Sequence, residues 1–331
     1  MRIAMTLVVR DEADIVETWL RYHLARGVDV VIVTDHRSVD GTSEILQEHE
    51  RDGRVVLLRE ESDILRQAEW TTRMARLAAT EHEADWVIPS DADELWWPRA
   101  GTFADILGSV PERFGVVRGL MRHFVLRTGD APFHERMTLR GRPTEDLTSP
   151  YHAQVKVTFR AVPDARVSVG NHDVEGVGLR LIREWFPFEV LHFPIRDERQ
   201  LEAKFLRRTT SPDGQHIVRA LDMLARGDRD VLLAEALAGD REGSLVEDVR
   251  LRDALRGLDT YGRLPEPAPL TSLDDADLAE DAHVVLDLDS AVIAERQCAA
   301  LEQAVAVLEQ RASIGARVAR RARREPRGDL G

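Results

Sequence analysis

Three carboxylates lie within four residues in the stretch VIPSDADELWW, at Asp91, Asp93 and Glu94. An apolar run typical of a buried strand precedes them, and the chain's two lysines, Lys156 and Lys204, lie far away in the sequence. Hard divalent cations prefer oxygen ligands, and a cation removes the repulsion that otherwise makes such crowding of acids costly. We therefore expect Asp91 and Asp93 to hold Mn²⁺ or Mg²⁺, with coordination positions left open for substrate phosphates. A solvated acidic turn is the alternative for so short a motif.

The N-terminal part of the chain alternates between strand-like and helix-like patterns. Residues at helical spacing predict helices between four apolar, partly β-branched runs that we predict as strands, at 3–9, 28–33, 55–58 and 86–89. Strands that alternate with helices pair in parallel, with helices on both faces of an α/β sheet. Ligands of such sheets bind at the carboxyl ends of the strands. Asp35 and Asp91 both follow strand ends, so we expect them to converge on one crevice.

Other polar residues near these strand ends could bind a nucleotide. The Asp35 carboxylate could accept hydrogen bonds from a base or from ribose hydroxyls, or it could simply form the turn. Arg66 and Gln67 begin a predicted helix, where the helix N-terminus and a cation could both face a diphosphate. An exposed helix face is the alternative for that pair. Trp97 could form a platform for an acceptor, or it could pack in the core.

The second part of the chain has a different organisation. Beyond about residue 110 the pattern is mixed, with strands expected at 115–125, 154–159 and 189–192, and beyond about residue 201 it is mostly helical. We predict a catalytic domain over residues 1–215 and a helical extension over residues 216–331. The extension would contain a linker around 264–282, a heptad-patterned helix at about 288–322 and a basic tail.

The C-terminal heptad helix and the basic tail also suggest partners. An amphipathic helix most often packs on its own domain, and homodimerisation through this helix is the alternative. The arginines of the tail could make a weak contact with an anionic membrane surface, although a solvated tail is the simpler interpretation.

The bulk composition excludes several classes of protein. The formal net charge of −14 argues against a general nucleic-acid-binding protein, because phosphate backbones demand a basic surface. Cys298 is the only cysteine, which excludes an internal disulfide framework and a cysteine-rich metal site. The apolar run at the N-terminus is too short for a signal peptide or a membrane span. We expect a cytoplasmic protein, with peripheral contact to a membrane as the alternative.

Several segments resemble a glycosyltransferase of the GT-A fold, and they are most similar to family 2 and its bacterial relatives that open with VRNEAD. The matching text is LVVRDEADIVETWLRYHLARGVDVVIVTDHRSVDGTSEIL, then DADEL, YHAQVKV and HFPIRDERQLEAKF. The resemblance covers roughly residues 1–210 and implies a Rossmann-like mixed sheet with helices on both faces. The chain has His36 and Arg37 where the family usually has a second acid and a glycine, which leaves the identity of the base open.

The resemblance also implies roles for particular residues. Asp91 and Asp93 would hold the metal on the diphosphate, and His192 would return from the far end of the domain as a third ligand, with His172 as its competitor. Lys156 and Lys204 fall in segments that recur in the family, where a lysine could neutralise phosphate or hold an acceptor. The nucleotide would be bordered by residues at the ends of the first two strands: Val8, Arg10, Glu12 and Asp35.

A mechanism follows from charge. Sugar transfer from a nucleotide donor releases a nucleoside diphosphate, and a bound metal stabilises the negative charge that develops on it. A carboxylate on the opposite side of the sugar would take the proton of the acceptor hydroxyl, which gives inversion. The candidates for that base are Glu94, Asp146 and Asp173.

The sequence therefore predicts a metal-dependent, inverting glycosyltransferase. Its partners would be a nucleotide-sugar donor and a hydroxyl acceptor, which could be a glycan, a lipid-linked molecule or a small molecule. Two alternatives share the fold: a nucleotidyltransferase that makes an activated sugar, and a binding protein without catalytic activity. The first usually carries a glycine-rich loop after its first strand, whereas the segment VVRDEAD has no glycine.

Overall fold

The computed structural model describes residues 1–127, 129–142, 153–183, 185–197, 200 and 245–265. Contacts divide the chain into two units, and all the helices and strands named below belong to the first, Met1–Leu181 with Phe186–Ala282. Asp146, Lys204, the heptad-patterned helix and the basic tail lie outside the described residues, as does most of the predicted linker.

Eight strands form one mixed sheet in the order β3-β2-β1-β4-β8-β6-β11-β5. The first four of these strands are parallel and match the four apolar runs of the N-terminal part of the sequence. They are β1 (Ile3–Val9), β2 (Val30–Asp35), β3 (Val55–Arg59) and β4 (Trp86–Asp91). The prediction of these strands is confirmed, although β2 continues past its apolar residues to Asp35.

The other half of the sheet mixes strand directions. β8 pairs antiparallel with both β4 and β6, β11 runs parallel to β6, and β5 pairs antiparallel with β11 at the edge. The bounds of this half are β5 (Glu94–Pro98), β6 (Val116–His123), β8 (Val155–Arg160) and β11 (Phe188–His192). Three of these strands match the sequence prediction, but β5 does not, because a segment with one acid followed by three apolar residues has no strand-like alternation.

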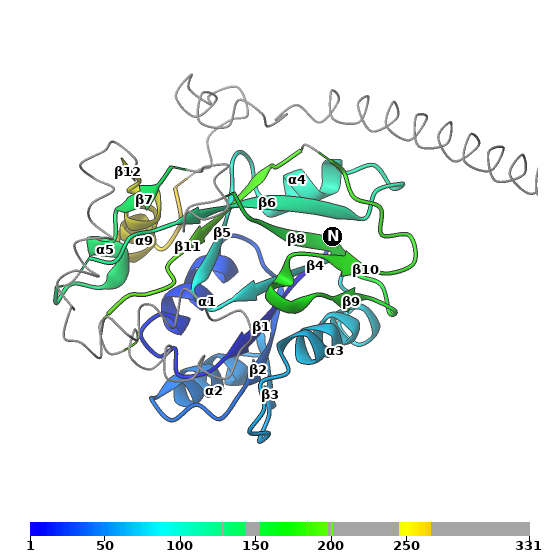
Figure 1. Cartoon of the computed structure of the whole chain (residues 1–331), viewed down its shortest axis with the longest axis horizontal. Coiled ribbons are helices and arrows are strands. Elements are labelled where there is room, and N and C mark those ends of the chain that lie inside the picture. The colour runs from blue at the N-terminus through cyan, green and yellow to red at the C-terminus, as the bar shows by residue number, and fades with distance from the viewer. Residues whose placement is uncertain (128, 143–152, 184, 198–199, 201–244, 266–331) are drawn as a thin grey trace, which may run out of the picture. The chain divides into compact units, whose positions relative to one another are not determined.

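Helices cover both faces of the parallel half, as the α/β pattern predicts (Figure 1). α1 (Val16–Ala25) and α2 (Thr42–Arg51) connect β1, β2 and β3, whereas α3 (Gln67–Thr80) leads back past them to β4. Because such connections are right-handed, α3 lies on the opposite face from α1 and α2. Its Met74, Ala75 and Ala78 belong to the buried apolar cluster that lines this face.

Shorter elements complete the described part of the first unit. α4 (Phe103–Ser109) begins with a capping box in which Thr102 and Asp105 exchange side-chain and backbone hydrogen bonds. The 3₁₀ turn η1 (Val169–Asn171) lies between the strands of a small hairpin. The remaining elements are β9 (Arg166–Val167), β10 (Val174–Glu175), α5 (Phe133–Arg136), β7 (Leu139–Gly141), β12 (Leu245–Glu247) and α9 (Arg250–Tyr261).

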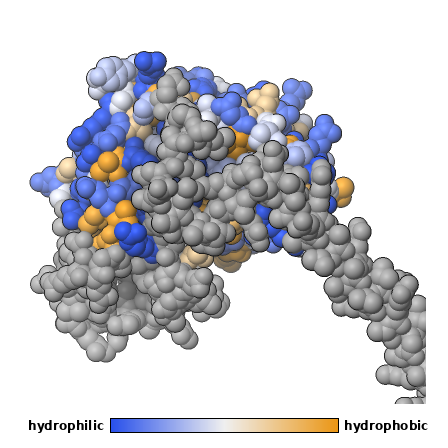
Figure 2. Space-filling view, turned by 90° about the horizontal axis from the view of Figure 1, so that it is seen from above, coloured by the Kyte–Doolittle hydropathy of each residue, from blue (hydrophilic) through white to orange (hydrophobic). Residues whose placement is uncertain are grey.

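The surface fits the charge balance of the sequence. Figure 2 shows a largely hydrophilic face of the described residues, on which apolar side chains form separate patches. Within the described ranges, no helix combines the length and the apolar character that a membrane crossing needs.

Candidate functional site

The acidic motif lies where the parallel half of the sheet ends. Asp91 is the last residue of β4, Asp93 lies in the turn after it, and Glu94 is the first residue of β5. In the register of the sheet Asp91 pairs with Val8, and Asp35 pairs with Val9. The carboxyl ends of β2, β1 and β4 are therefore level, which confirms that Asp35 and Asp91 lie at the same end of these strands.

Asp91 is held by donors from three different elements. Gln67 Nε2, at the start of α3, lies 2.6 Å from Asp91 Oδ1, and Asn171 Nδ2 of η1 lies 3.4 Å from the same oxygen. Lys156 Nζ of β8 lies 3.3 Å from Asp91 Oδ2. Each carboxylate oxygen has two lone pairs, so these contacts leave room for a cation as well.

Lys156 and Glu94 form a buried ion pair beside Asp91. Lys156 Nζ lies 2.6 Å from Glu94 Oε1, and both side chains are almost fully buried. Burial raises the pKa of Glu94 to about 8, because Asp91 and Asp93 add to the effect and only Lys156 opposes it. Burial works against the charge of Lys156, but Glu94 and Asp91 outweigh it and raise the pKa of that ammonium. Lys156 is thus the close counter-ion of both Glu94 and Asp91, and acidic groups outnumber the ammonium group at this place.

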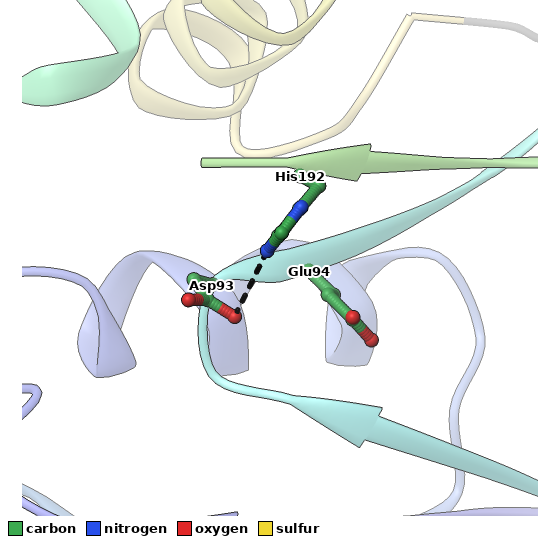
Figure 3. Close-up of side chains that lie close together, drawn as sticks. All are labelled: Asp93, Glu94 and His192. Atoms are coloured by element: carbon green, nitrogen blue, oxygen red, sulfur yellow. Dashed lines mark ion pairs between the residues drawn. The ribbon is translucent and has the colours of Figure 1, made fainter. Parts of the chain in front are cut away.

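Asp93 faces a histidine rather than a lysine. His192, the last residue of β11, projects toward Asp93 in Figure 3, and its Nε2 lies 3.7 Å from Asp93 Oδ1. One ligand atom each from Asp93, Glu94 and His192 lie within 4.8 Å of one another. Two carboxylate oxygens and an imidazole nitrogen suit Mn²⁺ and, more weakly, Mg²⁺. This group fits a divalent cation; it contains the predicted Asp93 and His192, but its third member is Glu94 and not the predicted Asp91.

Arg196 ties the end of β11 to the loop after β1. Its buried guanidinium contacts Asp14 Oδ2 at 2.6 Å and Asp14 Oδ1 at 2.8 Å, and it also pairs with Glu12. Burial opposes its charge, but the contacts with Asp14 and Glu12 raise the pKa of the guanidinium. Gln200 Nε2 donates to Glu12 at 3.2 Å. The Glu12 carboxylate, which the resemblance places beside the nucleotide, is therefore held by protein donors.

The other predicted nucleotide-binding residues lie at or near the carboxyl ends of the same parallel strands. Asp35 is buried, and its carboxylate accepts hydrogen bonds from the Ser38 amide at 3.1 Å and from the Ser43 hydroxyl in the turn after β2. Arg10 is partly exposed beside Asp11, and Val8 is partly buried.

The predicted acceptor residues are divided between two places. His172 Nδ1 lies 2.7 Å from the Val155 carbonyl oxygen, next to the η1 turn. Trp97 lies further along β5, where its ring packs against the guanidinium groups of Arg26 and Arg250. The structure therefore brings His172 toward Asp91 but places Trp97 away from it.

Two further predicted site residues, Asp173 and Arg66, lie next to the elements η1 and α3, which supply donors to Asp91. Asp173 is exposed in the turn after η1, and its carboxylate accepts a hydrogen bond from the Val174 amide at 2.9 Å. Arg66 is exposed at the N-terminus of α3 and pairs with Glu69 at 3.5 Å.

Sequence reasoning assigned no role to Arg196, Asn171 or Gly170. Gly170 and Asn171 both have left-handed backbone conformations, with φ of 72° and 59°. The Gly170 carbonyl accepts a hydrogen bond from Lys156 at 2.6 Å, and its amide donates to Gln67 at 3.2 Å. The dipeptide Gly-Asn is a turn signal, and it was the available clue.

Comparisons with known proteins give a limited picture. No protein-family model matches the chain. No curated protein matches it either. Solved structures that are similar include S. aureus TarS 1-349 in complex with UDP-GlcNAc, at 11% identity over 85% of this chain and 78% of that one, with a TM-score of 0.36. The same fragment in complex with UDP has 12% identity over 72% and 71% of the two chains, with a TM-score of 0.34.

A second similar protein is the glucosyl-3-phosphoglycerate synthase of Mycobacterium tuberculosis in complex with Mn²⁺, UDP and phosphoglyceric acid. It has 21% identity over 39% of this chain and 44% of that one, with a TM-score of 0.25. These identities and TM-scores are too low to assign a function to this chain.

Proposed function

We propose that this chain is a metal-dependent, inverting glycosyltransferase with a GT-A catalytic domain. It would move a sugar from a nucleotide-diphosphate donor to a hydroxyl acceptor. The observation that carries the proposal is the group of Asp93, Glu94 and His192, next to Asp91 at the carboxyl end of β4.

The topology supports a nucleotide at this edge. The chain runs outward from β1 to β2 and β3, and then returns across the sheet to β4 on the other side of β1. Ligands of open α/β sheets bind where the strand order reverses in this way, beyond the carboxyl ends of the strands. Val8 and Asp91 lie opposite each other at this point.

The charge of the site supports a cation. Lys156 is committed to Glu94 and Asp91, and Arg196 is committed to Asp14 and Glu12. An added cation would offset the repulsion between these acids and a diphosphate. We propose that Asp93 and His192, with Asp91 beside them, hold Mn²⁺ or Mg²⁺, which when bound stabilises the charge of the departing nucleoside diphosphate.

The chain's own residues position the donor and move the proton. Lys156 keeps Asp91 and Glu94 in place as their counter-ion, and the level strand ends offer backbone and Asp35 to the nucleoside. A carboxylate takes the proton of the acceptor hydroxyl as the new glycosidic bond forms on the opposite face of the sugar. Glu94 and Asp173, together with Asp146, are the candidates for this base.

Isothermal titration with UDP-, GDP- and dTDP-sugars, with and without Mn²⁺, tests the proposal. We expect at least one of these donors to bind in a metal-dependent manner, and His192→Gln to weaken that binding. Metal-independent binding, or no binding of any donor, would count against the proposed function.

Product analysis separates the two alternatives. A nucleotidyltransferase would consume a nucleoside triphosphate and a sugar phosphate and release pyrophosphate. A binding protein without catalytic activity would leave the bound donor intact, whereas a transferase without acceptor slowly hydrolyses it.

A further inference from the structure

Two neighbouring parallel strands, β6 and β11, both end in a histidine. His123 and His192 are paired in the register of the sheet, so their side chains stand on the same face. The two imidazole rings meet edge to face, with centroids 5.0 Å apart and an angle of 68° between their planes. His123 Nδ1 lies 2.9 Å from His192 Nδ1, which is a hydrogen-bond distance.

A hydrogen bond between two Nδ1 atoms needs one proton, and its position decides what His192 can do. If the proton is on His123, the Nδ1 of His192 is the acceptor and its own proton must be on Nε2. That Nε2 faces Asp93 and would then have no lone pair for a cation. A positively charged His123 leads to the same arrangement. Only a proton on His192 Nδ1 leaves the Nε2 lone pair directed at the acids.

We propose that His123 is a positioning residue that accepts the Nδ1 proton of His192 and so keeps the His192 Nε2 lone pair available to the cation. This inference rests on the proposed function, because it assumes a cation beside Asp93. Histidines that bind metals usually donate their second ring N–H to a neighbouring acceptor, which fixes both the tautomer and the ring orientation. Here a second imidazole takes that place.

The surrounding backbone and packing hold the two rings in position. The Phe124 amide donates to the His192 carbonyl at 2.8 Å, and the Phe193 amide donates to the Asp93 carbonyl at 2.8 Å. The rings of Phe124 and Phe193, each one residue beyond a histidine, stack with centroids 4.3 Å apart. The strand ends that carry both histidines are thus fixed to each other and to the acidic turn. A rigid arrangement of this kind is what a positioning residue requires.

Substitution of His123 tests the role through Mn²⁺ binding in the absence of donor and acceptor. His123→Phe keeps a ring but removes the acceptor, so we expect the Mn²⁺ affinity measured by titration calorimetry to fall about 10–100-fold. His123→Asn offers a side-chain oxygen near the former Nδ1, so its affinity should stay within a few fold of wild type. His49→Phe is the matched control, because His49 lies on α2 and pairs with Glu17. Thermal unfolding in EDTA shows whether each variant is folded.

Nitrogen-15 NMR of the metal-free protein gives a second readout that a purely structural role would not predict. We expect the His192 signals, assigned by their loss in His192→Gln, to show the tautomer protonated at Nδ1. Protonation at Nε2 in wild type, or unchanged Mn²⁺ affinity in folded His123→Phe, would overturn the role of His123 alone. If wild-type protein bound no Mn²⁺ at all, the metal dependence of the proposed function would fall together with it.

Discussion

Asp91 and Asp93 are two residues apart in the sequence, yet their carboxylates contact different side chains. The Asp91 carboxylate accepts contacts from Gln67, Lys156 and Asn171, so protein donors already satisfy much of its charge. The Asp93 carboxylate faces His192, an aromatic base that can share a cation with it. The comparison shows that a repeated residue type in a short motif can divide into an anchored acid and a cation-facing acid.

The residues around Asp91 (the Asp91 side) and those around Asp93 (the Asp93 side) also come from different parts of the structure. The donors to Asp91 belong to α3, β8 and η1, whereas the Asp93 side is built by β6 and β11. Glu94 touches both sides, because it pairs with Lys156 and lies within the group of Asp93 and His192. Substitutions on the Asp91 side should therefore affect stability first, and those on the Asp93 side should affect metal binding first.

The largest effect should come from Lys156→Met. Above pH 8, where Glu94 is ionised, removing Lys156 leaves the buried Glu94 and the half-buried Asp91 without their counter-ion, so we expect unfolding to require about 3–5 kcal/mol less free energy. Urea denaturation in EDTA measures this loss. The additional substitution Glu94→Gln should recover part of it, since it removes the charge left unpaired. A single Lys156→Met variant as stable as wild type would show that the pair does not anchor this side.

Substitution of the two aspartates sharpens the comparison itself. Asp93→Asn should weaken Mn²⁺ binding by about 100-fold or more, because loss of a direct ligand should exceed the 10–100-fold effect of an outer contact. Asp91→Asn should weaken it less, because this carboxylate is already engaged by protein donors. Titration calorimetry with Mn²⁺ compares the two variants under one condition. Equal losses, or a larger loss for Asp91→Asn, would reverse the assignment of roles.

The η1 turn on the Asp91 side should be sensitive to a single methyl group. Gly170 has φ of 72°, and an added Cβ would lie 2.8 Å from the His172 ring. Gly170→Ala should therefore destabilise the protein by about 2 kcal/mol, from backbone strain and this close contact together. Gly178→Ala is the matched control, because Gly178 has φ of 80° but nothing within 4 Å of the added Cβ. If both variants lost the same stability in urea denaturation, the contact with His172 would be unimportant.

The smallest effect is a pH dependence from Glu94 in metal-free protein. Burial raises the pKa of Glu94 from 4.5 to about 8, so its contribution to stability is complete below pH 4.5 and is lost as the pH rises through 8. Burial lowers the pKa of His23 from 6.5 to about 3, and this opposite contribution is already complete above pH 6.5. The window between pH 6.5 and 8 therefore reports on Glu94.

In that window we expect wild type to lose stability relative to Glu94→Gln, by on the order of 1 kcal/mol. Urea denaturation of both proteins in EDTA at the two ends of the window measures the difference. A difference that stays constant, or that grows in favour of wild type as the pH rises, would show that Glu94 is ionised throughout.

The sequence by itself determined the parallel half of the sheet and the place of the acidic motif. The spacing of apolar residues and the types of turn residues are local properties, so apolar runs such as 3–9 and 86–89 indicate strands without knowledge of their neighbours. Parallel pairing then requires Asp35 and Asp91 to lie at one edge. The edge strand β5 was missed because Glu94–Pro98 is short and shows no alternation of polar and apolar residues, although its two tryptophans favour strands, and it pairs with β11.

Only the tertiary structure decided which side chains surround each acid. Lys156 reaches Asp91 across 65 residues of sequence, His123 reaches His192 across 69, and Arg196 reaches Glu12 across 184. These pairs depend on the insertion of antiparallel β8 between β4 and β6 and on the return of β11 beside β6. No local period encodes that order, because strand order is set by the packing of the whole sheet. The local sequence thus determines that the motif is acidic, whereas the fold determines that Asp91 and Asp93 have different surroundings.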